Sequence, residues 1–171
     1  MSSIIHPYFA YGSNLNRSDM QARCPDARPG TTARLQGWRL TFRGVADIEP
    51  AEGGTVDGAL WTVTTADILR LDRYEGAPSN YHQRIVEVET DHGVREAMTY
   101  VMTGEPYLGL PSAWYLDRIE TGFRDWELPL SALRRAVEET RDELDGLGVV
   151  RYDPDGRKRM RAILAAGDER S

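Results

Sequence analysis

The sequence has 171 residues but contains a single cysteine and only three histidines. One cysteine, Cys24, excludes an internal disulfide and a cysteine-rich metal site, and we expect it to be structural. The histidines, His6, His82 and His92, lack metal-ligand spacing and form no His-Glu-x-x-His pattern. The sequence therefore indicates no metal site.

Long apolar runs and an excess of positive charge are also absent. The longest apolar runs fall far short of the ~20 residues that a membrane-spanning helix needs, so we expect no membrane segment. The net charge of -6 and the pI near 5.1 argue against non-specific nucleic-acid binding, which requires clustered Lys and Arg. Residues 1–7 lack a basic region followed by an apolar core, which indicates no secretory signal and a cytoplasmic protein.

What is present is the composition of a globular domain. Hydrophobic residues make up 40% and charged residues 28%, and the length allows one core of ordinary size. We expect one domain over residues 1–140, followed by a helical or partly mobile extension over residues 141–171. The sequence leaves open whether the protein is a monomer or a homodimer.

Apolar periodicity predicts five strands and several helices, most of them late in the chain. The expected strands cover residues 4–11, 32–42, 56–63, 81–89 and 94–102. Expected helices follow Ser18 and Thr64 and cover residues 112–123, 129–144 and 157–166. This order favours an α+β fold over repeated βαβ units.

Local signals refine these elements. Ser18 with Gln21 and Thr64 with Asp67 each have the spacing of a helix-capping pair, and the second helix leads to Glu75. Residues 46–54 are rich in Glu, Gly and Pro, so we expect a loop there. Gly37 interrupts the second strand and predicts a bulge. The four tryptophans are assigned to packing.

The most informative segment is residues 8–15, Tyr-Phe-Ala-Tyr-Gly-Ser-Asn-Leu. Its aromatic part predicts a buried strand, and Gly12, Ser13 and Asn14 predict a tight loop in which backbone N–H groups can face an anion. A helix start nearby adds partial positive charge, so a small acidic ligand is the expected guest. Taken alone, such a segment is more often a strand followed by a solvated turn.

A second segment, residues 71–76 with the sequence Leu-Asp-Arg-Tyr-Glu-Gly, precedes Tyr81. Together the two segments resemble the γ-glutamylcyclotransferase family, also called AIG2-like, which has Tyr-Gly-Ser-Asn-Leu near its start and Glu-Gly after a short helix. Further similarities in the same order lie at residues 33–38, 99–103 and 111–115. The resemblance covers roughly residues 8–130. It departs from the family at Ala113, where a second proline is common, and in the link 77–80.

This resemblance implies both a fold and a reaction. The fold would be a small mixed, strongly curved sheet that closes toward a barrel, flanked by helices, with a cavity at one end. The reaction would be attack of the substrate's α-amino group on its own γ-carbonyl, which releases 5-oxoproline and the free amine. It needs neither water nor a cofactor.

The resemblance also assigns roles to residues. Glu75 corresponds to the catalytic glutamate, and we expect burial to raise its pKa so that it can accept the ammonium proton. Tyr81 and Tyr100 are expected to be walls of the site or hydroxyl donors beside Glu75, and Tyr115 corresponds to a substrate-contacting tyrosine. The family's substrate-binding loop corresponds to Tyr8, Phe9, Ala10, Tyr11, Gly12 and Ser13. Ser13 lacks the Gly-x-Ser-x-Gly elbow of a serine nucleophile.

Three functions remain open at this point. The first is a cyclotransferase that acts on γ-glutamyl amino acids or on a γ-glutamyl-protected metabolite. The second is the same chemistry on γ-glutamylamines, and the third is a relative that binds a small carboxylate without turnover. A catalytic glutamate beside an intact loop favours the enzymes over the binder. The sequence does not identify the leaving amine.

Overall fold

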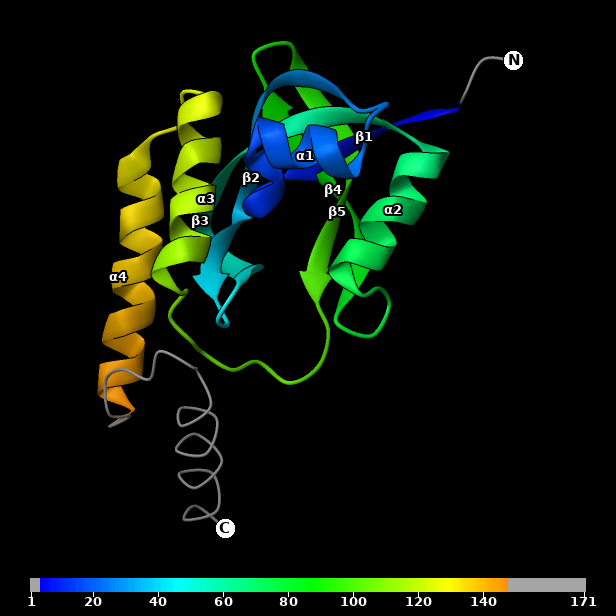
Figure 1. Ribbon diagram of the computed structural model, residues 1–171. Helices are drawn as coiled ribbons and strands as arrows, with labels where there is room; N and C mark the ends of the chain where they lie inside the picture. Colours follow the sequence, from blue (N-terminus) through cyan, green and yellow to red (C-terminus); the bar gives the residue numbers. More distant parts are fainter. Residues whose placement is uncertain (1–3, 148–171) are drawn as a thin grey trace.

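The computed structural model describes residues 4–147, and a closed five-stranded barrel forms its centre (Figure 1). The strand order around the barrel is β1-β3-β2-β4-β5. Strand β1 meets β5 in parallel, and the other strand pairs are antiparallel. The strands are β1 (Ile5–Ala10), β2 (Arg28–Phe42), β3 (Ala46–Thr64), β4 (Tyr81–Thr90) and β5 (Gly93–Met102). The expected α+β barrel is therefore confirmed.

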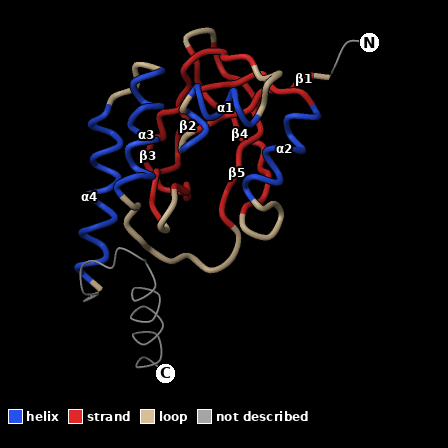
Figure 2. Tube along the Cα trace, in the orientation of Figure 1, coloured by secondary structure: helices blue, strands red, loops and turns tan. Residues whose placement is uncertain are grey.

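Helices cover the barrel on opposite sides. Figure 2, coloured by secondary structure, shows α3 and α4 packed on one side and α2 on the other. Among residues 4–147 no helix combines the length and the apolar character needed to cross a membrane. The helices are η1 (Ser13–Leu15), a single 3₁₀ turn, and α1 (Arg17–Arg23), α2 (Thr65–Glu75), α3 (Ala113–Asp125) and α4 (Leu130–Gly146).

The expected loop at residues 46–54 is wrong, because this segment belongs to β3. It pairs with the end of β2, from Phe42 opposite Ala46 to Trp38 opposite Pro50. Composition misled because a Glu- and Pro-rich strand can still be held by hydrogen bonds along its length. The bulge predicted at Gly37 is confirmed by a shift in register there and by a φ of 79°.

Helices α1, α2 and α3 each begin at a side-chain cap, and one cap differs from expectation. The Thr64–Asp67 capping box is present, and the helix expected from residue 112 begins as α3 with Ser112 as its cap. Ser18, by contrast, does not cap α1: the Asn16 side chain accepts the backbone N–H of Asp19 at 3.1 Å. The short 3₁₀ turn places α1 so that Asn16, two residues before Ser18, occupies the capping position.

The strands expected at residues 81–89 and 94–102 are confirmed and pair as the hairpin of β4 and β5, but the alternation around Ile85 does not place that residue in the core. Val86 and Val88 are buried, whereas Ile85 is 61% exposed. The boundary expected at residue 140 falls within α4, where Leu144 is buried and Arg39 pairs with Glu143. The division into domain and extension stays a prediction, and the helix expected at 157–166 lies outside the described residues.

Two tryptophans and a glycine hold the loop that follows β1. The indole N–H of Trp61 donates to the Asn14 carbonyl at 3.1 Å, and that of Trp126 donates to the Leu15 carbonyl at 2.9 Å. A Cβ added at Gly122 of α3 would come within 2.7 Å of the Leu15 Cβ, so the glycine allows the helix to approach this closely. The core thus fixes the loop from two sides.

Cys24 and Trp114 lie outside the contacts that hold this loop. Cys24 is buried, its thiol donates to the Asp67 carbonyl at 3.6 Å, and burial raises the pKa of the thiol to about 11. These features agree with a structural cysteine. Trp114 is 68% exposed, so its assignment to packing is wrong; it lies in the first turn of α3, where the Arg118 guanidinium stacks on its ring.

Candidate active site

A cavity lies where the loop after β1 meets the C-terminal end of α2. Four elements from distant parts of the chain add further side chains, namely β3, β4, β5 and the first turn of α3. The lining residues are Tyr8, Tyr11, Gly12, Ser13, Asn14, Ala46, Glu75, Tyr81, Tyr100 and Tyr115. The barrel therefore brings together most of the residues that the sequence had singled out.

Phe9 and Ala10 are the two expected loop residues that do not line the cavity. Both are buried, and the Phe9 ring packs so closely on Gly58 that a Cβ there would lie 2.6 Å from it. Successive side chains of a strand point to opposite faces, so Tyr8 can face the cavity only if Phe9 faces away. The structure assigns Phe9 and Ala10 to the core.

Glu75 is the last residue of α2, and Gly76 ends the helix in the left-handed conformation with a φ of 65°. Its Oε1 accepts a hydrogen bond from Asn14 Nδ2 at 2.9 Å. Burial raises the pKa of Glu75 to about 7, against the smaller lowering effects of the Asn14 hydrogen bond and the Arg23 charge. Such a carboxyl group can both accept and release a proton near neutral pH.

Two tyrosines converge on the start of β3. The Tyr81 hydroxyl donates to the Ala46 carbonyl at 2.8 Å, and the Ala46 N–H donates to the Tyr115 hydroxyl at 3.0 Å. A Cβ added at Gly12 would lie 3.0 Å from the Ala46 Cβ, so the loop needs a glycine to approach this strand. The backbone N–H and C=O of Ala46 thus hold the Tyr115 and Tyr81 side chains in the cavity wall.

The opposite wall consists of tyrosines in contact with one another. The rings of Tyr8 and Tyr100 meet edge to face with centroids 5.9 Å apart, and the Tyr11 hydroxyl donates to the Tyr100 carbonyl at 2.6 Å. Burial raises the pKa of Tyr8 and of Tyr11 well above 10 and that of Tyr115 to about 12. These hydroxyls therefore stay neutral and can donate hydrogen bonds at any physiological pH.

Residues 8–126 match the family described as "Gamma-glutamyl cyclotransferase, AIG2-like". The chain belongs to this family. The curated gamma-glutamylcyclotransferases of Bos taurus and Homo sapiens are each 33% identical over 137 residues, which is 72% of this chain and 72% of the relative.

Solved structures give the same family fold. One titled "Gamma-glutamyl cyclotransferase" has a TM-score of 0.70 and 27% identity, and the match covers 84% of this chain and 99% of that one. A Homo sapiens protein titled uncharacterized protein loc79017 has a TM-score of 0.69 and 30% identity, with 77% and 86% covered. Every residue that lines the cavity falls within the part of the chain that matches the γ-glutamylcyclotransferase family.

Asn14 is the member of this γ-glutamylcyclotransferase site whose contacts the sequence did not predict. Its Nδ2 donates to the Tyr8 hydroxyl and to Glu75, each at 2.9 Å, while its Oδ1 accepts from Arg23 at 2.6 Å. The sequence indicated only that an asparagine tolerates the turn. An amide that follows Gly-Ser directly was the available signal, but its partners lie on α1, β1 and α2 and meet only in the folded barrel.

Metal ligation finds no support at this site. Within residues 4–147 no group of three or more His, Cys, Asp or Glu side chains is placed to hold a metal ion. Glu75 is the carboxylate that lines the cavity, and its neighbours are tyrosines and an amide. The arrangement suits proton transfer to and from a polar, acidic substrate.

Proposed function

We propose that the protein is a γ-glutamylcyclotransferase that converts a γ-glutamyl amino acid, or a γ-glutamyl-protected metabolite, into 5-oxoproline and the free amine. Membership of the family supports the reaction class. The observation that carries the proposal is a carboxyl group with a pKa of about 7, Glu75, in a cavity lined by neutral tyrosines and the Gly-Ser loop. A protein that only binds a carboxylate would not need such a base.

Glu75 acts first as base and then as acid. The substrate's α-amino group arrives as an ammonium, gives a proton to Glu75, and its nitrogen attacks the γ-carbonyl carbon to form the lactam C–N bond. Glu75 gives that proton to the departing nitrogen as the original γ C–N bond breaks, then takes the second surplus proton of the ring nitrogen and passes it to the released amine, which leaves as an ammonium. No water is consumed, and the reaction requires no redox step or cofactor.

The raised pKa makes this transfer feasible. A free glutamate, with a pKa of about 4.3, and an α-amino group, at about 7.8, differ by roughly 3.5 units, which opposes proton transfer by about 5 kcal/mol. With the pKa of Glu75 at about 7 most of this difference disappears. Proton transfer then costs about 1 kcal/mol.

The loop and the tyrosines would hold the substrate in a reactive shape. We assign the backbone N–H groups of Gly12 and Ser13 to a substrate carboxylate or to the oxygen that becomes negative during attack, where such donors contribute ~3 kcal/mol each. Tyr81 and Tyr115 supply neutral hydroxyls on the other side. Holding the glutamyl chain curled brings the amine to the carbonyl carbon and replaces a search through many conformations.

The same proposal covers the setting of the enzyme. The substrates are small γ-glutamyl compounds rather than nucleic acids or membranes, and the enzyme works in the cytoplasm as a monomer or homodimer. A γ-glutamylamine is the alternative substrate, because it shares the glutamyl half and differs only in the leaving group.

Product analysis tests the function. The protein is incubated with γ-glutamyl amino acids, γ-glutamylamines and glutathione, and 5-oxoproline, released amine and free glutamate are quantified. We expect 5-oxoproline and amine in a one-to-one ratio from at least one substrate, with no glutamate. Glutamate in place of 5-oxoproline would identify a hydrolase, and no product from a folded protein that binds these ligands would favour the non-catalytic binder.

A further inference from the structure

We propose that Arg23 is a positioning residue for Glu75: it fixes the side-chain amide of Asn14 so that the amide nitrogen, and not the oxygen, faces the carboxylate. The inference builds on the proposed role of Glu75 as the base. Arg23 does not line the cavity and acts on the reaction through Asn14. Nothing in the sequence pointed to it.

The polarity of its hydrogen bonds fixes the orientation of the Asn14 amide. Arg23, in the last turn of α1, places its Nη1 2.6 Å from Oδ1 of Asn14. A guanidinium carries only donors, so the amide oxygen must face it and the amide nitrogen must point the other way. In that orientation Nδ2 reaches Glu75 and the Tyr8 hydroxyl. A flipped amide would place its oxygen against the carboxylate and its nitrogen against the guanidinium.

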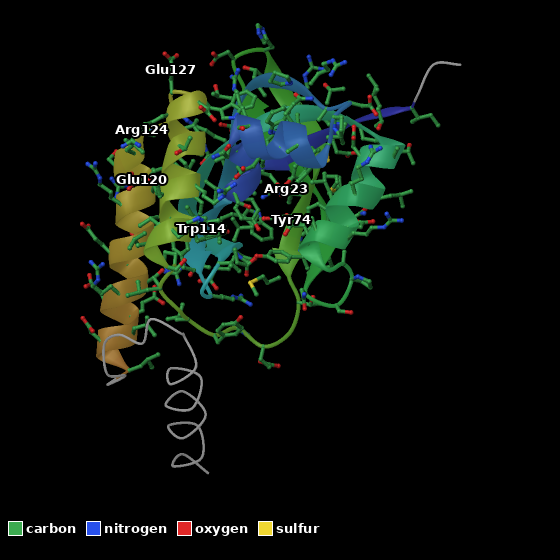
Figure 3. All side chains as sticks on the ribbon, viewed as in Figure 1. Arg23, Tyr74, Trp114, Glu120, Arg124 and Glu127 are labelled. Carbon is green, nitrogen blue, oxygen red and sulfur yellow. The ribbon has the colours of Figure 1, made fainter. Side chains whose placement is uncertain are left out.

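Arg23 is itself held in place by an aromatic ring. Its guanidinium carbon lies 3.7 Å from the ring centroid of Tyr74, the residue directly before Glu75 on α2, and Figure 3 shows the two side chains together. The guanidinium therefore contacts both the loop amide and the end of the helix that carries the base. The attraction between a cation and the face of an aromatic ring holds the long side chain in place.

Charged and polar groups around Glu75 set its pKa. The positive charge of Arg23 and the Asn14 hydrogen bond both lower the pKa of Glu75, against the larger effect of burial. Two other carboxylates raise the pKa of tyrosines that line the cavity. Asp47, which pairs with Arg43, acts on Tyr81, and Asp72, which accepts a hydrogen bond from the Tyr100 hydroxyl, acts on Tyr100. The titratable hydroxyls that interact with Glu75 are those of Tyr8, Tyr11, Tyr81, Tyr100 and Tyr115.

The test compares Arg23→Met with wild type. Methionine keeps much of the length that packs on Tyr74 but removes the charge and the donors. We expect the pKa of Glu75 to rise by about one unit, because the charge is lost and the amide is free to turn its oxygen toward the carboxyl group. The acid limb of the pH profile of kcat/KM should move upward by the same amount. Arg23→Lys, which keeps a charge and a donor, should restore most of this shift.

Arg17→Met is the matched control. Arg17 lies on the same helix and also stacks on an aromatic ring, 4.2 Å from the Trp126 centroid, but Asn14 is not its partner. It should leave the profile unchanged. A lower rate with an unmoved acid limb in Arg23→Met, or an equal shift in Arg17→Met, would overturn the positioning role.

A second readout separates this inference from the proposed function. The Glu75 carboxyl is titrated by NMR in protein labelled with ¹³C-glutamate, without substrate, and its signal is assigned by its loss in Glu75→Gln. An upward shift in Arg23→Met supports the positioning role even if no tested compound is turned over. An unshifted Glu75 in an active enzyme would contradict the positioning role and leave the cyclotransferase function intact.

Discussion

Replacing Glu75 with Gln should lower kcat/KM for 5-oxoproline release by about 1,000-fold, within the range that a general base contributes. Glutamine keeps the shape of the side chain and an oxygen that can accept from Asn14 Nδ2, but it can neither take the ammonium proton nor return it. The measurement is initial-rate kinetics on whichever γ-glutamyl substrate gives the fastest turnover. KM should change less than kcat, because the substrate's contacts with the loop and tyrosines remain.

The stability of the same variant provides an internal control. The folded-state pKa of Glu75, about 7, lies above its ordinary value of 4.5, so its contribution to stability is fully present below pH 4.5 and is lost as the pH rises through 7. Above pH 7 the buried charge costs about 3 kcal/mol. Glu75→Gln removes that cost and should melt no lower than wild type at pH 8.

An exposed glutamate gives the matched substitution. Glu138 lies on α4 and is exposed, so Glu138→Gln should leave both turnover and melting temperature unchanged. If folded Glu75→Gln retained turnover comparable to wild type, the base would have to be another group and the mechanism would be wrong.

Asn14→Leu should reduce kcat/KM at pH 7 by about 10-fold, the second largest effect that we expect. Leucine has the same number and branching of side-chain heavy atoms, but it removes the donor to Glu75, the donor to the Tyr8 hydroxyl and the acceptor of Arg23. Without the amide the pKa of Glu75 rises, so less of the enzyme carries an ionised base at neutral pH. Kinetics across pH should show the acid limb displaced upward at least as far as in Arg23→Met.

This variant also leaves buried polar groups without hydrogen-bond partners, which lowers the free energy of unfolding by about 1–3 kcal/mol. Thermal melting separates that cost from the effect on catalysis, since assays are run well below the melting temperature. The Trp61 bond to the Asn14 backbone carbonyl survives the substitution, so the loop should remain in place. A fall in rate with an unmoved acid limb would mean that Asn14 does not tune Glu75.

Local signals in the sequence predicted much of the fold. Apolar periodicity predicted strands β4 and β5, and the Thr64–Asp67 capping pair and the helix expected from residue 112 gave the starts of α2 and α3. Residues 46–54 were missed because their strand is defined by pairing with β2, and not by their own composition. Barrel closure followed only from the family resemblance, since pairing between β1 and β5 is invisible to local periodicity.

The candidate site divides in the same way. Short motifs located Glu75 and the Gly12–Ser13 loop, and the barrel brings them to one cavity. The same motif reading included Phe9, which the alternation of β1 turns into the core, and Ala10, which is also buried and does not line the cavity. Asn14 and Arg23 were beyond sequence reasoning because their roles depend on hydrogen bonds between residues that meet only after α1, α2 and β1 are assembled.

The most direct test of the central claim, that Glu75 is a base with a pKa raised by burial, is the pH dependence of kcat/KM for wild-type 5-oxoproline release between about pH 5 and pH 9. Activity should rise with pH along an acid limb whose apparent pKa lies near 7, because Glu75 must be ionised to accept the ammonium proton. An acid limb near 4.5, the ordinary value for a glutamate, would contradict the account.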